Sequence, residues 1–278
     1  MPPEAIAAAL VSALIHAGWN AALKAGRDRL VDLGQMAIGG CAIGGVMIAL
    51  AGLPRVESWP YIAASCAVHF VYWVALSRGY ATGDMSHVYT IARGSAPALV
   101  TIGALVAASE LPTPATLAGI ALVSIGIFAV GFSPKAPWRA TGWAVLTGVS
   151  IATYSLIDAL GARVAGDVLA YKGIGAIGTF LPILLFALAR RGPRQFATIG
   201  QGRWAVGAFA GAISIVGFAI VLWAQQRAPI GPITALRETS VVFGALIAAF
   251  VLKEHVAPRR WLGAGLVAAG VAAIALAR

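Results

Sequence analysis

The sequence predicts an all-α integral membrane protein whose ten transmembrane helices form two inverted five-helix repeats. Three observations indicate this fold: the composition, the recurrence of long apolar blocks, and a resemblance between the two halves of the chain. Hydrophobic residues make up 60% of the 278 residues and charged residues only 11%. Soluble domains carry roughly a quarter charged residues because their surface is polar. Most apolar side chains of this chain must therefore face lipid.

Five apolar blocks occupy the first half of the chain. A helix that crosses roughly 30 Å of hydrocarbon needs about 20 apolar residues. Charged residues, Pro and Gly separate blocks of this length at 5–23, 33–53, 59–80, 85–108 and 115–132. Only Glu4 is charged before the first block, which lacks the basic segment of a signal peptide and is expected to be retained. Cys41 and Cys66 lie inside blocks, without metal-ligand spacing, and are expected to act as small hydrophobic groups.

The second half contains five further blocks of similar length. They lie at 141–160, 168–189, 204–226, 230–252 and 261–277. The connections are short, so no separate soluble domain is expected. The alternating pattern of a β-barrel strand does not occur.

The net charge of +10 is scattered between the apolar blocks, which is typical of topology signals and disfavours nucleic-acid binding. Of the 20 Lys and Arg residues, 13 follow the odd-numbered blocks and 4 lie in the other connections or at the termini. The positive-inside rule therefore places both termini outside.

The two halves, 1–133 and 134–278, resemble each other. With an offset of 144 residues, four positions match without a gap: Arg93 with Arg237, Glu110 with Glu254, Gly119 with Gly263, and Gly126 with Gly270. With an offset of 135, residues 9–26 match 144–161 and pair Trp19 with Tyr154. Five helices per half is an odd number, so the repeats must be inverted, which favours alternating access around a site at the midplane.

Three segments resemble the EamA family of the drug/metabolite transporter superfamily: HAGWN at 16–20, SELPTPATLAG at 109–119 and KEHVAPRRWLGAG at 253–265. The resemblance implies a five-plus-five fold with a central cavity lined by spans 1, 3, 4, 6, 8 and 9, and with spans 5 and 10 at the periphery. It implies cargoes such as amino acids, nucleosides, drugs and other metabolites. Characterised relatives usually have cytoplasmic termini, opposite to the charge bias, so both orientations stay open.

Arg93 and Arg237 are the leading candidates for substrate binding. Ionisable residues within spans cost roughly 2.5–3.5 kcal/mol each on insertion scales, so they normally face a cavity or a partner. A guanidinium group presents a planar set of donors that suits a carboxylate or phosphate. The alternative is that the arginines pair with Asp158 or Glu238 and hold helices together.

Glu238 and Asp158 are candidates for proton coupling, because burial favours the neutral form of a carboxyl group. The favoured alternative is a permanent ion pair with a buried arginine. Lys172, near the start of its span, is expected to extend its amine to the membrane interface.

A second group of candidates forms an aromatic and polar cavity wall. His16 and Asn20 are one helical turn apart and share a face with each other. Trp19 and Tyr154 occupy matched positions in the repeat. For this group the alternatives are hydrogen bonding between helices and ordinary packing. Weaker candidates of the same kind are Tyr72, Tyr89, Trp223 and Gln226, with His69, Trp73 and His87.

The function predicted is secondary transport of a small anionic or zwitterionic metabolite, such as an amino acid or organic acid. An exporter of hydrophobic cations or nucleosides is the alternative. An intramembrane enzyme is disfavoured because no HExxH, GxSxG or paired-aspartate motif appears, and a scaffold without cargo is disfavoured by the repeat. No cofactor or metal is expected. The expected partners are the substrate, the lipid bilayer, and a coupling proton or exchanged solute, for a monomer or weak dimer in a cell membrane, specifically a bacterial inner membrane.

Overall fold

The computed structural model describes residues 1–23, 29–133, 135–199 and 204–277. Within these ranges the chain forms helices and no strands. The α-helices are α1 (Pro3–Leu23), α2 (Arg29–Ala51), α3 (Trp59–Thr82), α4 (Met85–Ala108), α5 (Pro114–Gly131), α6 (Trp138–Val164), α7 (Val168–Ile199), α8 (Trp204–Gln225), α9 (Ile230–Arg237), α10 (Ser240–Leu246) and α11 (Pro258–Leu276). A 3₁₀ turn, η1 (Val56–Ser58), precedes α3, and a π-helical segment, η2 (Ile247–Val251), follows α10.

Side chains in the short connections define where several helices begin. Asp84 accepts a hydrogen bond from the Ser86 amide at 2.8 Å and caps α4. Thr113 accepts one from the Thr116 amide at 3.2 Å and caps α5, and Pro114 occupies its first turn. These contacts satisfy N–H groups that have no partner within the helix.

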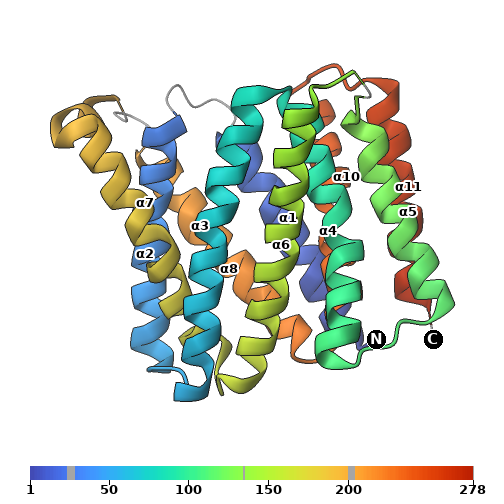
Figure 1. Cartoon of the computed structure of the whole chain (residues 1–278), viewed down its shortest axis with the longest axis horizontal. Coiled ribbons are helices and arrows are strands. Elements are labelled where there is room, and N and C mark those ends of the chain that lie inside the picture. Colours follow the sequence, from blue (N-terminus) through green and yellow to red (C-terminus); the bar gives the residue numbers. More distant parts are fainter. Residues whose placement is uncertain (24–28, 134, 200–203, 278) are drawn as a thin grey trace.

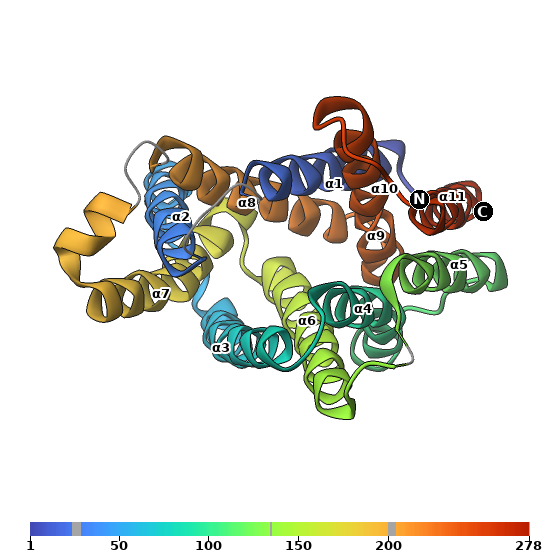
Figure 2. The same cartoon turned by 90° about the horizontal axis from the view of Figure 1, so that it is seen from above.

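The helices run up and down through one elongated bundle, with both termini at the same end (Figure 1). Viewed from above, α2 and α7 lie at one extremity and α5 and α11 at the other (Figure 2). Between them α8 contacts α1 on one side, and α6 contacts α3 and α4 on the other. α5 and α11 correspond to the fifth and tenth predicted spans, and both lie at the periphery, as expected.

Nine segments in the described residues are long and apolar enough to cross a membrane. They include every predicted span except the first. The count therefore differs by one from the predicted ten, although α1 has 21 residues, a length of about 31 Å at 1.5 Å per residue. The spans predicted at 141–160 and 168–189 were too short, because α6 and α7 continue beyond the apolar blocks.

The span predicted over 230–252 is confirmed as one membrane-length segment, Ile230–Val251, but its helical pattern is not uniform. This span is divided into α9, α10 and η2, with a break at Glu238 and Thr239. In α7, helical geometry is interrupted at Gly192, which has φ of +70° and ψ of +152°. Glycine adopts this conformation without the steric cost of a Cβ atom.

Glycines let helices pack closely at two seams. Between α5 and α11, a Cβ atom added to Gly126 would lie 2.8 Å from the carbonyl oxygen of Gly263, and one added to Gly119 would lie 2.8 Å from that of Gly270. Gly44 in α2 faces Gly173 in α7 in the same way. Gly40, Gly207 and Gly211 also lie close to neighbouring helices, since an added Cβ would overlap Phe180, Gln35 and Met36 respectively.

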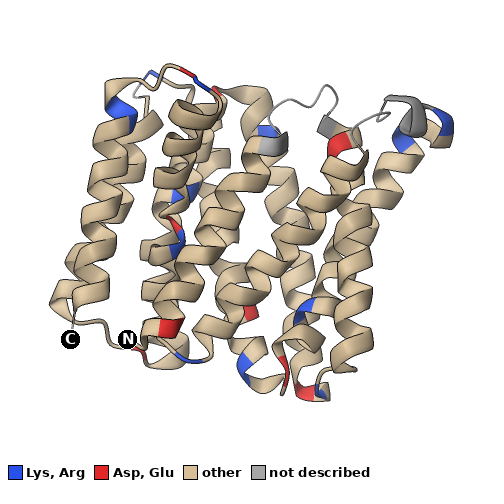
Figure 3. Ribbon diagram, turned by 180° about the vertical axis from the view of Figure 1, so that it is seen from behind, with Lys and Arg blue, Asp and Glu red and all other residues tan. Residues whose placement is uncertain are grey.

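Charged residues lie mainly at the two ends of the bundle, and a few lie part-way along the helices (Figure 3). Large apolar side chains instead point outward along its sides, among them Leu50, Phe70, Phe209 and Leu262, each more than 60% exposed. This distribution suits a chain surrounded by lipid at mid-height. Lys24, Arg27, Arg203 and Arg278, which contributed to the predicted charge bias, lie outside the described residues.

Candidate functional site

An ion pair lies in the interior of the bundle, between α4 and the break that follows α9. The guanidinium Nη2 of Arg93 is 2.9 Å from a carboxylate oxygen of Glu238, and the two residues are only 6% and 2% exposed. The same nitrogen donates a hydrogen bond of 3.5 Å to the Ser240 hydroxyl. Arg93 therefore has the ion-paired geometry of the helix-joining alternative, and its part in substrate binding stays a prediction.

The break after α9 determines where Arg237 and Glu238 point. The amides of Glu238 and Thr239 donate to carbonyls three residues earlier, at 3.0 and 3.1 Å, and the Thr239 hydroxyl donates to the Leu236 carbonyl. These bonds tighten the chain into a 3₁₀-like turn. Glu238 thus reaches Arg93, whereas Arg237 reaches Phe218 of α8.

Two cations contact the single aromatic ring of Phe218. The Cζ atom of Arg237 lies 5.2 Å from the ring centroid, and the Nζ atom of Lys172 lies 4.2 Å from it. Within the described part of the chain, neither cation has a carboxylate within 4 Å, and the Nε of Arg237 is buried without a hydrogen-bond partner. Cation–π contacts of this kind are worth about 2 kcal/mol when desolvated, less than the several kcal/mol that it costs to take a cation out of water.

The expectation that Lys172 reaches the membrane interface was wrong. The residue is 5% exposed and its amine lies over Phe218, toward the interior. Lys172 and Phe218 are the functional candidates that sequence reasoning missed. A charge within an apolar span was a signal for Lys172, but Phe218 carried no signal at all.

Phe218 belongs to a cluster of aromatic rings from three helices, α3, α6 and α8. The rings of Tyr154 (α6) and His69 (α3) stack with centroids 4.0 Å apart. Tyr72 of α3 and Phe218 approach Tyr154 edge-on, at 5.8 and 6.3 Å. The structure thus brings together Tyr154 and Tyr72, two of the predicted wall residues.

Asp158 lies one helical turn after Tyr154 on α6 and is 3% exposed. Its Oδ1 accepts a hydrogen bond of 3.0 Å from the Tyr171 hydroxyl, and its Oδ2 is buried without a hydrogen-bond partner. Among the described residues, Asp158 forms no ion pair with an arginine. The favoured ion-pair alternative therefore fits Glu238 but not Asp158.

The candidates on α1 and at the start of α4 lie in less enclosed positions. His16 packs edge-on against Trp19, with centroids 5.0 Å apart, and Asn20 is exposed and donates to the His16 carbonyl. Tyr89 is 37% exposed, and its ring centroid lies 6.0 Å from Cζ of Arg93.

Trp223 and Gln226 lie at the C-terminal end of α8, at the end of the bundle where both chain termini are found. Arg227 covers the Trp223 ring at 4.0 Å, and the Gln226 amide donates to the Ala162 carbonyl at 2.6 Å. Trp223 nevertheless packs against the core cluster that contains Phe218 and Tyr154, whereas Gln226 belongs to the end of the bundle.

Glu110, Arg163 and the chain from Gln225 to Ile230 form a set of polar contacts, called the latch below, at this end of the bundle. One carboxylate oxygen of Glu110 is 2.7 Å from Nη2 of Arg163, and the other accepts a hydrogen bond of 2.6 Å from the Ile230 amide at the start of α9. Arg163 also donates to the Gln225 carbonyl at 2.8 and 3.0 Å. The latch therefore joins the α4–α5 connection, the end of α6 and the α8–α9 turn.

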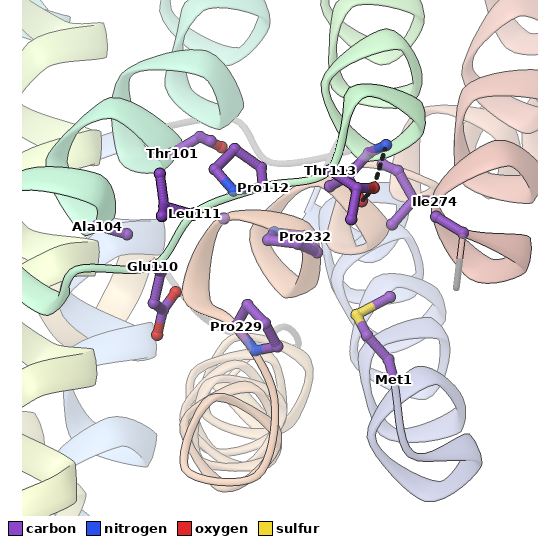
Figure 4. Close-up of a pocket in the computed structure, with 13 residues that line it drawn as sticks. Met1, Thr101, Ala104, Glu110, Leu111, Pro112, Thr113, Pro229, Pro232 and Ile274 are labelled. Atoms are coloured by element: carbon purple, nitrogen blue, oxygen red, sulfur yellow. Dashed lines mark hydrogen bonds between the residues drawn. The ribbon is translucent and has the colours of Figure 1, made fainter.

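A cavity of about 220 Å³ lies beside this latch (Figure 4). It is lined by the α4–α5 connection, the start of α9 and the ends of the chain, with Glu110, Pro229, Pro232 and Met1 on its walls. Glu110 is the one residue with an ionisable side chain among those that line this cavity, and both of its carboxylate oxygens already have partners. No cluster of three or more His, Cys, Asp or Glu residues that could hold a metal ion occurs in the described ranges.

A family model described as the EamA-like transporter family matches residues 138–276, half of the chain. The chain belongs to the EamA-like transporter family. The matched region of this EamA-like transporter begins with the first residue of α6 and ends with the last residue of α11. The expected family membership is thereby confirmed.

A solved structure titled "Crystal structure of protein" has the same fold as this EamA-like transporter. The TM-score is 0.74 at 19% sequence identity, over 98% of this chain and 95% of the other. A comparison with curated proteins found no match. The chain is thus an all-helical membrane protein of a transporter family.

Proposed function

We propose that this chain is a secondary transporter that carries a small anionic or zwitterionic metabolite across a cell membrane by alternating access. The observation that carries this proposal is the pair of cations, Arg237 and Lys172, that lie inside the bundle without a carboxylate partner among the described residues. An anionic group of the substrate would supply the missing partner.

The proposed mechanism needs two inverted halves, and several observations support them. The helix contacts come in corresponding pairs, α1 with α8 and α6 with α3. Gly119 and Gly126 correspond in sequence to Gly263 and Gly270, yet Gly119 packs on Gly270 and Gly126 on Gly263. This reciprocal contact is what a two-fold axis between antiparallel helices generates. The family match over one half also favours a repeat at 1–133 and 134–278.

Two further features favour alternating access. The broken span at Glu238 resembles the discontinuous helices that carry substrate sites in many transporters. The latch around Glu110 joins segments from both proposed halves at the end that holds the termini. A contact of this kind would have to open when the site becomes accessible from that side. No ATP-binding motif occurs in the sequence, so the proposed transport is secondary.

The charge of the site disfavours the alternative cargo, a hydrophobic cation. Such a cation could stack on Tyr154 and Phe218, but Arg237 and Lys172 on the same ring would repel it.

Transport into liposomes tests the proposal. Metabolite classes are first screened by thermal shift of the purified protein, and the stabilising compounds are then used in uptake assays. Arg237→Gln is expected to reduce uptake about tenfold or more, since a hydrogen bond to a charged group is worth about 1.5–3 kcal/mol.

The matched control is Arg139→Gln, because Arg139 is exposed and lies over Trp138 at the outside of the bundle. Its uptake should equal that of the wild type. Wild-type uptake by Arg237→Gln, at the same amount of folded protein, would contradict the proposal.

A further inference from the structure

We infer that Glu254 forms a second latch at the opposite end of the bundle, on the start of α4, and that this contact and the latch around Glu110 form in turn during transport; this inference rests on the proposed function. Two observations point to it. The connections that carry the two glutamates share an unusual backbone conformation. The helix start that Glu110 caps also has a counterpart in the other half, at the start of α4.

The backbone beside Glu110 and Glu254 is alike in the two connections. In the described ranges, the non-glycine residues with a positive φ are Ser109 and Lys253, each at +53°. Such values are uncommon for residues other than glycine, and these two residues are separated by the repeat offset of 144. The amides of the glutamates that follow them donate to the carbonyls of Ala104 and Ala248, at 3.2 and 2.8 Å, which are also 144 residues apart. The correspondence between the two glutamates therefore extends from sequence to backbone geometry.

The helix start that Glu110 caps corresponds to the start of α4. Ile230, whose amide donates to Glu110 at 2.6 Å, matches Ser86 with the same offset. The Ser86 amide donates instead to Asp84, a residue of its own connection, at 2.8 Å. In the view from above, the α3–α4 and α10–α11 connections lie on opposite sides of the bundle (Figure 2). The end that holds the termini is thus joined across the bundle by the latch, whereas at the other end the start of α4 is capped locally.

Alternating access between inverted halves accounts for this difference between the two ends. In the second state each half adopts the conformation that the other half has in this structure, so contacts at one end give way to their counterparts at the other. Glu110 would then leave the start of α9, and Glu254 would replace Asp84 on the Ser86 amide. Each of these contacts places a carboxylate at the positive end of a helix dipole. The exchange therefore replaces one favourable contact by another of the same kind.

Distances between spin labels, measured by pulsed EPR, test the inference without a substrate. Both native cysteines are first replaced by alanine. One pair of labels, at Leu111 and Val164, spans the latch between the α4–α5 connection and the end of α6. The other pair, at Met85 and His255, spans the opposite end. All four positions are exposed, so a label can be attached at each.

Glu110→Ala should raise the population of the second state about fivefold or more, because it removes a contact comparable to a helix cap. The distance across the latch should become longer, and the distance at the opposite end shorter. Addition of Glu254→Ala should abolish the shortening, whereas the control Glu57→Gln alone should leave both distances unchanged. An unchanged distance at the opposite end in Glu110→Ala, or a shortening that persists without Glu254, would overturn the inference.

A crosslink provides a second measurement, in a chain that keeps the latch residues. Met85 corresponds to Pro229, and His255 corresponds to Leu111. Pro229 and Leu111 line the same cavity beside the latch, so the second state should bring their counterparts together. A disulfide between Met85→Cys and His255→Cys should form under oxidation and should accelerate amide hydrogen exchange at 225–235, and reduction should reverse this effect. Absence of the disulfide, or unchanged exchange after it has formed, would contradict the second latch.

These measurements separate the inference from the proposed function. The distances and the crosslink require no substrate, so their failure would overturn the second latch and leave the result of the uptake assay unaffected. If the wild type takes up none of the screened metabolites, the proposed function itself fails, whichever distances are found.

Discussion

Arg93 and Glu238 show how a pair of charges can be accommodated where lipid surrounds the bundle. Each charge alone would be costly to bury, and their attraction offsets this cost only because the two groups are 2.9 Å apart. The pair links α4 to the turn between α9 and α10, so it stabilises the backbone that presents Arg237. Among the described residues Arg93 therefore has a carboxylate partner within 4 Å and Arg237 has none, although the two match in the repeat.

A double-mutant cycle at this ion pair is expected to show strong coupling. Arg93→Met and Glu238→Met should each destabilise the protein by about 3–5 kcal/mol, because each leaves one buried charge without its partner. The double variant should be close to wild type, since it buries no charge. Thermal unfolding in detergent measures all three, and equal losses that simply add in the double variant would refute the coupling.

The interior location of Arg93 and Arg237 was predictable from the cost of charge in hydrocarbon, and the structure has both inside the bundle. The location of Lys172 was not predictable in the same way. A lysine near a helix end can extend outward or turn inward, and the choice depends on which face of α7 meets α8. Phe218 became a candidate only through the cations that the fold brings onto its ring.

At the level of the helices, the latch around Glu110 holds three connections together. Glu110 occupies the position of a capping residue for α9, although it belongs to a loop 120 residues earlier in the chain. An acidic group at this position also interacts favourably with the positive end of the α9 helix dipole. The latch is therefore suited to fix the start of the broken span.

Replacement of Glu110 should loosen the start of α9. Glu110→Ala removes both contacts and is expected to cost about 1–2 kcal/mol, in the range of a lost helix cap and a half-exposed ion pair. Glu110→Gln keeps one acceptor oxygen and should have a smaller effect. Hydrogen exchange of the peptide covering residues 225–235 should be faster in both variants.

The control for this experiment is Glu57→Gln, an exposed carboxylate in η1, whose neighbour Arg55 donates a backbone hydrogen bond to Ala165 just after α6. Its exchange at residues 225–235 should match the wild type. Unchanged exchange in Glu110→Ala would exclude the latch as a stabilising contact.

The break in the span over 230–252 illustrates what apolar block lengths do not reveal. Neither Pro nor Gly occurs between Ala235 and Phe243, so the usual helix-breaking residues are missing from the break. The tight turn coincides instead with the Thr239 hydroxyl bonding to Leu236 and with Glu238 reaching Arg93. The Thr239 contact is local, but the Glu238–Arg93 contact depends on tertiary structure, whereas the approximate limits of the other spans followed from apolar length alone.

For the whole molecule, the seam between α5 and α11 is the part whose geometry follows most directly from the repeated glycines. The sequence matched Gly119 with Gly263 and Gly126 with Gly270, and the structure packs each against the counterpart of the other. This reciprocity could not be read from the alignment of the halves, because an alignment does not state where the symmetry axis lies.

Gly126→Ala is expected to destabilise the protein by about 1–3 kcal/mol, the usual cost of overpacking. The added Cβ would lie 2.8 Å from the Gly263 carbonyl oxygen and 2.9 Å from a Val267 methyl group. Gly265→Ala on α11 is the control, because nothing lies within 4 Å of its added Cβ and alanine favours the helix. The melting temperature should fall for the first variant and stay equal or rise for the second.

The adjacent chain ends have a practical consequence for the open question of orientation. Met1 and Ala277 line the same cavity, and both cartoon views place the two ends side by side (Figures 1 and 2). A reporter enzyme or fluorophore fused to either end would consequently enter the same aqueous compartment. One such fusion would assign a side to every connection in the molecule, including the strongly basic ones at the opposite end.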